Sequence, residues 1–259
     1  MSFPLDKYVK KPSEASAPDQ IMIMGPYGGG KTYLAASASL VPELQKVLIL
    51  DLEGSTTGTV SDFSDQDLDI INIKKQARDN GIHPVEFFEA VLEVLWENED
   101  HYGTVVIDTL DVLNEMYIDY HDRNAEQENG SKNHFYKWTK TREVLTSSNG
   151  LIARLKDANF LSILVMHEEV DDTSGAFDFS WTGKGARSDL GQFPDLVMRV
   201  NRKYNPKKKV WNTEVITAPT ERGQAKSRYT EKIPPVIESD VTMAELWDMI
   251  TDTETTERV

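Results

Sequence analysis

The chain contains no cysteine among its 259 residues. This absence excludes disulfide bonds, thiolate catalysis and zinc sites built on cysteine. Histidine is also scarce, with only five residues in the chain. None of them forms a His-x-x-x-His pair, which would place two imidazoles on one helix face. We therefore expect no structural metal site.

Long hydrophobic runs are absent as well. No apolar stretch approaches the roughly 20 residues that cross a bilayer. The N-terminal segment MSFPLDKYVKKPSEASAPDQ lacks the apolar core of a signal peptide. From the sequence we expect a cytoplasmic protein with no membrane partner.

Positive charge is in short supply. The chain has 28 Lys and Arg against 43 Asp and Glu, a formal net charge of −15. Because contacts to phosphates come from Lys and Arg, this balance weighs against indiscriminate binding to nucleic acid. Residues 199–232 nevertheless hold ten Lys or Arg against three Glu, and the chain becomes acidic after Pro235. A functional basic segment and two ordinary solvated faces both explain this pattern.

A glycine-rich stretch, MIMGPYGGGKTYLAA, occupies residues 22–36. It fits G-x-x-x-x-G-K-[ST], with an apolar run before it and helix-forming residues after it, which is the context that the motif requires. A loop that leads from a strand into a helix directs successive backbone N–H groups at one point, and the helix dipole adds positive potential there. The motif therefore predicts a phosphate-binding loop.

Two side chains of this loop have specific expected roles. We expect Lys31 to lie at an exposed helix N-terminus with its charge on the β- and γ-phosphates, and the Thr32 hydroxyl to bind Mg²⁺. The cofactors are then ATP and Mg²⁺. The predicted nucleotide-binding residues are Gly25, Pro26, Tyr27, Gly28, Gly29, Gly30, Lys31, Thr32 and Tyr33.

Short apolar, β-branched runs recur along the chain and alternate with helical patterns in its first half. The runs are IMIM, KVLILD, LDIINI, GTVVID, FLSILVMH, PDLVMRV and VWNTEVITA. Such alternation predicts an α/β fold with a mostly parallel sheet and helices on both faces. The last two runs flank NRKYNPKKK, which indicates a turn, so we expect an antiparallel C-terminal hairpin. In PVEFFEAVLEVLWEN, apolar residues three or four apart predict a core-facing helix.

Composition divides the chain into three segments. Residues 1–19 are polar and contain prolines, which predicts a flexible N-terminal lead-in. Residues 20–235 carry the strand and helix patterns and are the expected nucleotide-binding core. Residues 236–259 are expected to form an acidic C-terminal tail.

The segment TVVIDTLD, residues 104–111, is an apolar strand that ends in Asp108. A carboxylate in this position can hold the Mg²⁺ shell, which is the Walker B role. Any strand can end in Asp, so this position alone is weak evidence. The phosphate loop upstream strengthens the assignment, because the two motifs occur together in P-loop proteins. We expect Asp111, one helical turn further, to be an N-cap rather than a ligand.

A second strand end, VLILDLEGS, covers residues 47–55. Hydrolysis of a γ-phosphate needs a group that positions and deprotonates a water molecule, and Glu53 lies two residues past this strand end. A solvated loop carboxylate is the alternative. The D-x-E arrangement of Asp51 and Glu53 resembles the RecA family, in which the glutamate has this catalytic role.

The resemblance extends to FLSILVMHEEV, in which the apolar run ends at His167. RecA-like ATPases carry a polar residue at this strand end that senses the γ-phosphate. The resemblance implies a RecA-like P-loop NTPase core with Lys31, Glu53 and His167 as catalytic residues. It also implies Thr32 and Asp108 as the residues that hold the metal. A structural histidine is the alternative for His167.

Two segments resemble the loops through which RecA contacts single-stranded DNA. DRNAEQENGSKNHFYKWTKTREV interleaves charged and aromatic residues, and DDTSGAFDFSWTGKGARSDLGQFPDLVMRV alternates aromatic with small polar residues. Both patterns suit backbone contacts and base stacking. Burial of the aromatics, under a helix or on one strand face, is the alternative. The candidates are Lys132, Phe135, Tyr136, Lys137, Trp138, Lys140, Arg142, Phe177, Phe179 and Trp181.

The segment ERGQAKSRY, residues 221–229, resembles a Lys-x-Arg element that RecA-like oligomers present to the nucleotide of a neighbouring subunit. The resemblance implies a homo-oligomer in which Lys226 and Arg228 act in trans. Lys184 and Arg187 are rival suppliers of this charge. Ordinary surface residues are the alternative explanation.

Over about residues 20–235 the chain is most similar to phage-encoded RecA-like ATPases of the single-strand-annealing recombinase group. This resemblance implies a DNA-stimulated ATPase that assembles on single-stranded DNA in the bacterial host cytoplasm. Such a protein would promote annealing or strand exchange in phage recombination and replication, with a single-strand-binding protein as a candidate partner. The alternative is a nucleotide-dependent assembly switch of the RecA superfamily that acts on protein partners.

Overall fold

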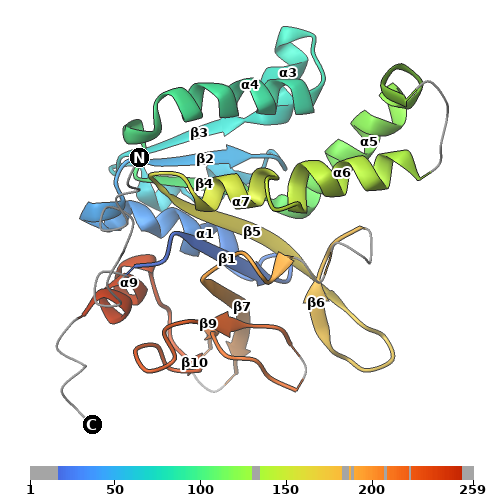
Figure 1. The fold of residues 1–259 in the computed structure, drawn as a ribbon. Coiled ribbons are helices and arrows are strands. Elements are labelled where there is room, and N and C mark those ends of the chain that lie inside the picture. The colour runs from blue at the N-terminus through green and yellow to red at the C-terminus, as the bar shows by residue number, and fades with distance from the viewer. Residues whose placement is uncertain are drawn as a thin grey trace, which may run out of the picture.

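A computed structural model describes residues 17–129, 135–182, 187, 190–206, 209–221 and 223–252. In this part of the chain a mixed sheet of ten strands lies between two layers of helices (Figure 1). The strands are β1 (Gln20–Gly25), β2 (Val47–Asp51), β3 (Leu68–Asn72), β4 (Thr104–Asp108), β5 (Leu161–Val170), β6 (Phe177–Phe179), β7 (Leu196–Asn205), β8 (Val210–Ile216), β9 (Lys226–Ser227) and β10 (Val236–Ile237).

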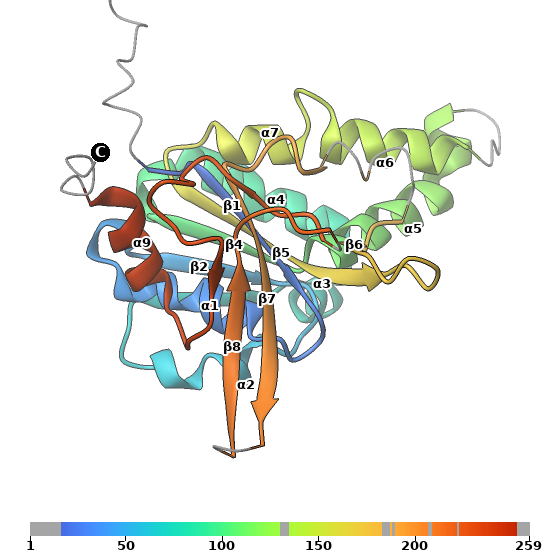
Figure 2. The same ribbon diagram turned by 90° about the horizontal axis from the view of Figure 1, so that it is seen from below.

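The order of strands across the sheet is β10-β8-β7-β1-β5-β4-β2-β3. The strands from β7 to β3 in this order pair in parallel, whereas β8 and β10 add antiparallel pairs at one end. β6 and β9 pair antiparallel with β5 and β7. The predicted α/β fold with a mostly parallel sheet and an antiparallel C-terminal hairpin is confirmed, and Figure 2 shows that hairpin extending beyond the other strands.

Helices cover both faces of the sheet. They are α1 (Lys31–Ala36), α2 (Thr56–Thr59), α3 (Ile73–Asn80), α4 (Pro84–Glu97), α5 (Leu110–Asn129), α6 (Tyr136–Thr146), α7 (Leu151–Lys156) and α9 (Met243–Thr251). Short 3-10 turns are η3 (Ser37–Leu40), η4 (Pro42–Leu44), η5 (Ser61–Phe63) and η6 (Glu99–His101). None of these described helices is long and apolar enough to cross a membrane.

Strand alternation creates two separate cores, because successive side chains of a strand point to opposite faces of the sheet. On β1, Met22 and Met24 pack with α4, α5 and α7, whereas Ile21 and Ile23 pack with α1 and α9. These four side chains are fully buried. The central strands are therefore apolar on both faces, as a sheet covered on both sides requires.

The predicted core-facing helix is α4. Its N-terminus carries a capping box, in which the Glu86 carboxylate accepts a hydrogen bond from the His83 backbone N–H and the His83 ring nitrogen Nδ1 accepts one from the Val85 backbone N–H. Val85 and Phe88 are fully buried against the sheet. The apolar spacing therefore predicted both the helix and its buried face.

The expected loop DRNAEQENGSKNHFYKWTKTREV is mostly helical, which corrects the prediction. α5 continues to Asn129 and α6 begins at Tyr136, and the two helices lie side by side (Figure 1). The charged and aromatic residues at positions 122–129 and 136–144 therefore lie at helical spacing rather than along an extended loop.

The expected acidic tail begins with ordered elements instead. Residues 236–237 form β10 at the edge of the sheet, and α9 packs on the core through Met243 and Leu246. The Met243 backbone N–H donates a 2.7 Å hydrogen bond to the Ser37 hydroxyl. The compact unit therefore extends past the predicted boundary at residue 235. Residues 253–259, and residues 1–16 of the expected lead-in, lie outside the described part of the chain.

Candidate functional site

The phosphate loop joins β1 to α1, as the motif predicted. Gly28 and Gly30 have positive φ angles of 70° and 96°, which side-chain-bearing residues rarely adopt. Gly25 is required for another reason, because any residue with a side chain would place a Cβ against the Val200 carbonyl oxygen of β7. A Cβ at Gly29 would lie 3.0 Å from the same oxygen. The glycines thus let the loop turn and let β7 approach it closely.

Lys31 is buried, with only 5% of its surface exposed, which corrects the expectation of an exposed position. Its ammonium group donates hydrogen bonds to the carbonyl oxygens of Gly25, at 3.0 Å, and Pro26, at 2.8 Å. Burial lowers the pKa of Lys31, while the carboxylates of Asp108, Asp111 and Glu53 oppose that shift. The amine is therefore held over the loop, where a phosphate oxygen can replace a carbonyl as its acceptor.

Thr32 and Asp108 meet in the structure although Thr32 lies on α1, which follows β1, and β5 separates β1 from β4, the strand of Asp108. The Thr32 hydroxyl donates a 3.0 Å hydrogen bond to Asp108 Oδ2, and the Thr56 hydroxyl donates a second at 3.1 Å. Asp108 Oδ1 is buried with no hydrogen-bond partner among the described residues. Burial raises the pKa of Asp108 to about 6, against the effect of the two hydroxyls.

These two side chains fit Mg²⁺. A hard divalent cation takes oxygen ligands, and the orphaned Asp108 oxygen beside the Thr32 hydroxyl offers them. A bound cation would also offset the energetic cost of burying the negative charge of this carboxylate, since a nearby opposite charge favours the ionised form. Thr32 and Asp108 are therefore the residues that would hold the metal.

Glu53 reaches the pocket through the turn that follows β2. Asp51 shapes this turn, because its Oδ1 accepts hydrogen bonds from the backbone N–H groups of Glu53, at 3.1 Å, and Gly54, at 2.7 Å. Glu53 Oε1 then lies 3.6 Å from His167 Nδ1 and 3.5 Å from the Thr109 hydroxyl. The candidate base and the candidate sensor predicted from the sequence are thus neighbours.

His167 lies within β5 rather than at its end, because the strand continues to Val170. The imidazole is nearly fully buried, and the ring of Tyr27 stacks on it with 3.9 Å between centroids. Its position opposite Gly25, the last residue of β1, is what brings it to the phosphate loop. The expected strand-end placement was therefore wrong, although the side chain does reach the pocket.

Asp111 holds the His167 ring, which corrects its predicted role as an N-cap. Its carboxylate lies 2.9 Å from His167 Nδ1 and accepts a 3.1 Å hydrogen bond from the His167 backbone N–H. Burial alone would raise the pKa of Asp111, but the contacts with His167 outweigh it and lower the pKa. Asp111 lies in the first turn of α5, not before it.

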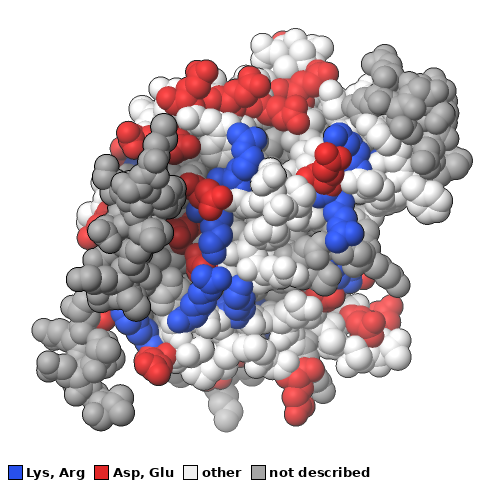
Figure 3. All heavy atoms as spheres, viewed as in Figure 1, with Lys and Arg blue, Asp and Glu red and all other residues white. Residues whose placement is uncertain are grey.

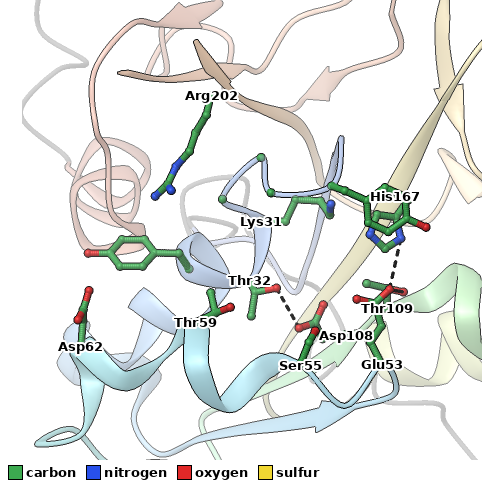
Figure 4. Close-up of a pocket in the computed structure, with 15 residues that line it drawn as sticks. Lys31, Thr32, Glu53, Ser55, Thr59, Asp62, Asp108, Thr109, His167 and Arg202 are labelled. Atoms are coloured by element: carbon green, nitrogen blue, oxygen red, sulfur yellow. Dashed lines mark hydrogen bonds and ion pairs between the residues drawn. The ribbon is translucent and has the colours of Figure 1, made fainter. Parts of the chain in front are cut away.

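Residues 27–33 of the phosphate loop and α1 line one pocket of about 480 Å³ together with Glu53, Asp108 and His167 (Figure 4), whereas the predicted nucleotide-binding residues Gly25 and Pro26 do not line it. Sequence reasoning missed part of its wall, namely Ser55, Thr59, Asp62, Thr109 and Arg202. The first three follow the β2 turn and Thr109 follows Asp108, so proximity to known motifs was the only available signal. No motif marked Arg202, which β7 brings to the phosphate loop from a distant part of the chain.

Two of the predicted DNA-stacking aromatics are buried. Phe179 and Trp181 are 1% and 3% exposed and belong to the core, so they offer no face to a base and the prediction was wrong for both. Phe177 is half-buried, with the Arg199 guanidinium 3.8 Å from its ring centroid. The alternative explanation, one buried strand face, accounts for this segment.

The aromatics at the start of α6 are more accessible. Phe135 is 76% exposed and Trp138 is 38% exposed, while Tyr136 is half-buried. Lys137 pairs with Asp122 at 3.0 Å, and Lys140 pairs with Glu143 at 3.2 Å. Arg142 is exposed on the same helix, and Lys132 lies outside the described residues.

Charge is divided over this face of the molecule. In Figure 3, acidic side chains dominate over α4, whereas lysines and arginines lie over α6 and α7. The candidate DNA-binding residues of α6 therefore lie on the less acidic part of the face, although two of its lysines are paired.

The candidates for a role in trans have partners within the chain. The Lys226 ammonium group donates to the carbonyl oxygens of Gly191, Gln192 and Pro194. Arg228 pairs with Asp195 at 2.8 Å, and Arg187 pairs with Glu169 at 2.8 Å. Lys184 lies outside the described residues. A role in trans, which would require these contacts to exchange, stays a prediction.

A comparison of the sequence with models of known protein families gives one match. The family model described as AAA domain matches residues 17–229. The chain belongs to the AAA domain family. This membership and the glycine-rich loop between β1 and α1 support a P-loop NTPase.

Other comparisons are more distant. Among solved structures, a KaiC-like protein from the hyperthermophilic archaeon Pyrococcus horikoshii OT3 is similar, with a TM-score of 0.38 and 12% sequence identity. The similarity covers 76% of this chain and 77% of that chain. No curated protein matches the sequence.

Proposed function

We propose that the protein is an ATPase that uses Mg²⁺ and acts on single-stranded DNA. The observation that carries the proposal is the convergence of three groups in one pocket: the Lys31 amine, the Thr32–Asp108 pair and the Glu53 carboxylate. A cation for the phosphates, oxygens for a metal and a base for water are the parts that phosphoryl transfer to water requires.

Nucleotide binding is expected to reuse contacts that the loop already makes. The Lys31 ammonium group exchanges a loop carbonyl for a phosphate oxygen, and the glycine-rich backbone supplies N–H donors. The charge of the pocket explains the need for a metal. Glu53, Asp62 and Asp108 oppose Lys31 and Arg202 among the described lining residues, so an anionic triphosphate would meet an excess of carboxylates.

Thr32 and Asp108 would hold Mg²⁺, which would supply positive charge to offset the negative charge of the phosphates. Glu53 orients a water molecule and accepts its proton as the water oxygen attacks the γ-phosphorus. The bond between that phosphorus and the β,γ-bridging oxygen breaks, so that ADP leaves with the electron pair and inorganic phosphate is the second product. His167 lies 3.6 Å from Glu53 and is fixed in orientation by Asp111. A contact between His167 and the γ-phosphate would therefore affect β5, which carries His167, and α5, which carries Asp111.

The direct test is phosphate release from ATP by the purified chain, with Mg²⁺ and again with EDTA. We expect turnover only with Mg²⁺. Asp108→Ala should behave as the EDTA sample does at all Mg²⁺ concentrations, whereas Glu93→Ala, at an exposed carboxylate of α4, should leave turnover unchanged. Equal turnover with EDTA would contradict the proposal.

Single-stranded DNA is the proposed polymer substrate, in phage recombination or replication through annealing or strand exchange. The exposed Phe135 and Trp138 on α6 support this, because exposed aromatic faces near lysines suit base stacking and backbone contact. The proposed working form is a homo-oligomer, with a single-strand-binding protein as a candidate partner. Stimulation of ATP turnover by single-stranded DNA at low salt is the expected result, and Phe135→Ala with Trp138→Ala should weaken it.

A nucleotide-dependent assembly switch that acts on protein partners is the second candidate. The burial of Phe179 and Trp181 favours it, because it removes one of the two predicted DNA-stacking segments. The net charge of −15 points the same way. If ATP changes the oligomeric state while DNA changes neither turnover nor assembly at low salt, the switch is the better description.

A further inference from the structure

We propose that Arg202, with Asp62, forms a nucleoside-binding end of the pocket that selects the base of the bound nucleotide. The inference rests on the proposed nucleotide binding and extends it to the part of the ligand that the phosphate loop does not read. It assigns Arg202 to the nucleoside rather than to the phosphates.

The pocket has two chemically different ends (Figure 4). Glu53, Thr109 and His167 gather at one end, whereas Arg202 and Asp62 lie at the other, beyond the phosphate loop. Because hydrolysis requires the γ-phosphate beside Glu53, the nucleoside of a bound nucleotide must extend toward the second end.

β7 fixes the position of Arg202. The Val200 carbonyl oxygen lies so close to Gly25 that this position has no room for a Cβ, and a Cβ at Gly29 would make a tight contact of 3.0 Å with the same oxygen. Alternate residues of a strand share a face, so Arg202 faces the phosphate loop as Val200 does. A Cβ at Gly30 would lie 3.5 Å from Arg202 Nε. Arg202 is therefore held against the loop by the strand itself.

Arg202 differs from the basic residues near it on β7, because those residues form ion pairs within the chain. Arg199 pairs with Glu168 at 2.7 Å, and Lys203 pairs with Glu214. No hydrogen bond or ion pair joins Arg202 to another residue in the described part of the chain, and its side chain points into the pocket (Figure 4). A planar cation directed at a ligand site stacks well on a nucleobase.

The surrounding groups fit a base rather than a phosphate. Asp62 adds a carboxylate, which accepts hydrogen bonds from an exocyclic amine but repels a phosphate. Tyr33, which follows Thr32 on α1, adds a half-buried ring whose centroid lies 5.0 Å from that of Phe63. A stacking cation, an acceptor and an aromatic wall are the chemistry of amino-nucleobase recognition.

Binding measurements with ATP and with inorganic tripolyphosphate, both with Mg²⁺, separate the two ends. We expect Arg202→Ala to raise the Kd for ATP about tenfold and to leave the Kd for tripolyphosphate unchanged, as for loss of one contact to the base. Arg202→Lys should recover only part of the ATP affinity, because lysine lacks the planar group. Lys203→Ala, at the next residue and on the opposite strand face, is the matched control and should change neither Kd.

Asp62→Asn tests the acceptor. The 6-amino group of ATP can donate to Asp62, whereas the 6-oxo group of ITP cannot, so the wild type should prefer ATP. In Asp62→Asn the ratio of the Kd for ITP to the Kd for ATP should be closer to one than in the wild type. An unchanged ratio would overturn the role of Asp62.

Two outcomes would overturn the assignment of Arg202: equal weakening of ATP and tripolyphosphate in Arg202→Ala, which marks a phosphate contact, or no change in either. Lys31→Ala distinguishes these from failure of the proposed function. If Lys31→Ala binds ATP and tripolyphosphate as tightly as the wild type, the phosphate site itself is wrong, whatever Arg202 does.

Discussion

Replacing Asp108 by asparagine should stabilise the unliganded protein while removing its response to Mg²⁺. Asp108 is a buried carboxylate whose Oδ1 has no partner among the described residues, so its negative charge is costly without a metal. Asparagine has nearly the same shape, and its side-chain oxygen can still accept from the hydroxyls of Thr32 and Thr56. The substitution therefore removes the charge and keeps the packing.

The pKa of Asp108 sets the size of the effect. Burial raises it from 3.8 to about 6, a rise of about two units, and each unit corresponds to roughly 1.4 kcal/mol. The native state thus binds a proton more tightly than the unfolded state does, so ionisation of Asp108 destabilises the fold. The cost is complete above about pH 6, and it disappears as the pH falls toward 4. The gain from Asp108→Asn should be at most about 3 kcal/mol at pH 8 and small at pH 4.

Urea unfolding of both proteins, without nucleotide or metal, measures this difference at several pH values. Asp62→Asn, at an exposed carboxylate of the same pocket, is the control and should give little change. Adding Mg²⁺ with ATP should raise the free energy of unfolding of the wild type more than that of Asp108→Asn. A variant that is less stable than the wild type at pH 8, or a difference that does not shrink with falling pH, would refute the reasoning.

Three further predictions concern the site and the C-terminal segment. Lys31→Ala should abolish ATP binding and lower the melting temperature slightly, since the loop loses two hydrogen bonds; calorimetry checks both, and retained affinity would contradict the assignment. Asp111→Asn should reduce kcat by about tenfold or more with little change in ATP affinity, because a neutral amide with one acceptor oxygen replaces the two carboxylate oxygens that contact the ring and the backbone of His167; a change in affinity alone would argue against this. Deletion of residues 239–259 should destabilise the fold by several kcal/mol, because α9 buries apolar side chains; a deletion variant as stable as the wild type would show that α9 is dispensable.

Local motifs predicted which residues line one end of the pocket. A glycine-rich turn between a strand and a helix has few structural solutions. Asp108 ends β4 and Glu53 follows β2, and the carboxyl ends of these parallel strands meet at one edge of the sheet. Topology brought in the rest. Arg202 reaches the loop only because β7 pairs with β1, and no local pattern encodes that pairing.

Some errors arose where one pattern fits two structures. Period-two aromatics suit both base stacking and a buried strand face, and burial won for Phe179 and Trp181. The acidic composition after Pro235 hid a helix whose signals were present. Thr242 and Glu245 form a capping box before buried residues at helical spacing, so charge alone was a poor guide to order.

The central claim is that this pocket hydrolyses ATP with Glu53 as the base, and Glu53→Gln tests it most directly. The amide keeps the shape of the side chain but cannot accept a proton. In a single turnover with bound ATP and Mg²⁺, we expect wild-type ATP affinity and a rate of phosphate release lower by about 10²–10⁴-fold. Release at the wild-type rate from a variant that binds ATP normally would contradict the account.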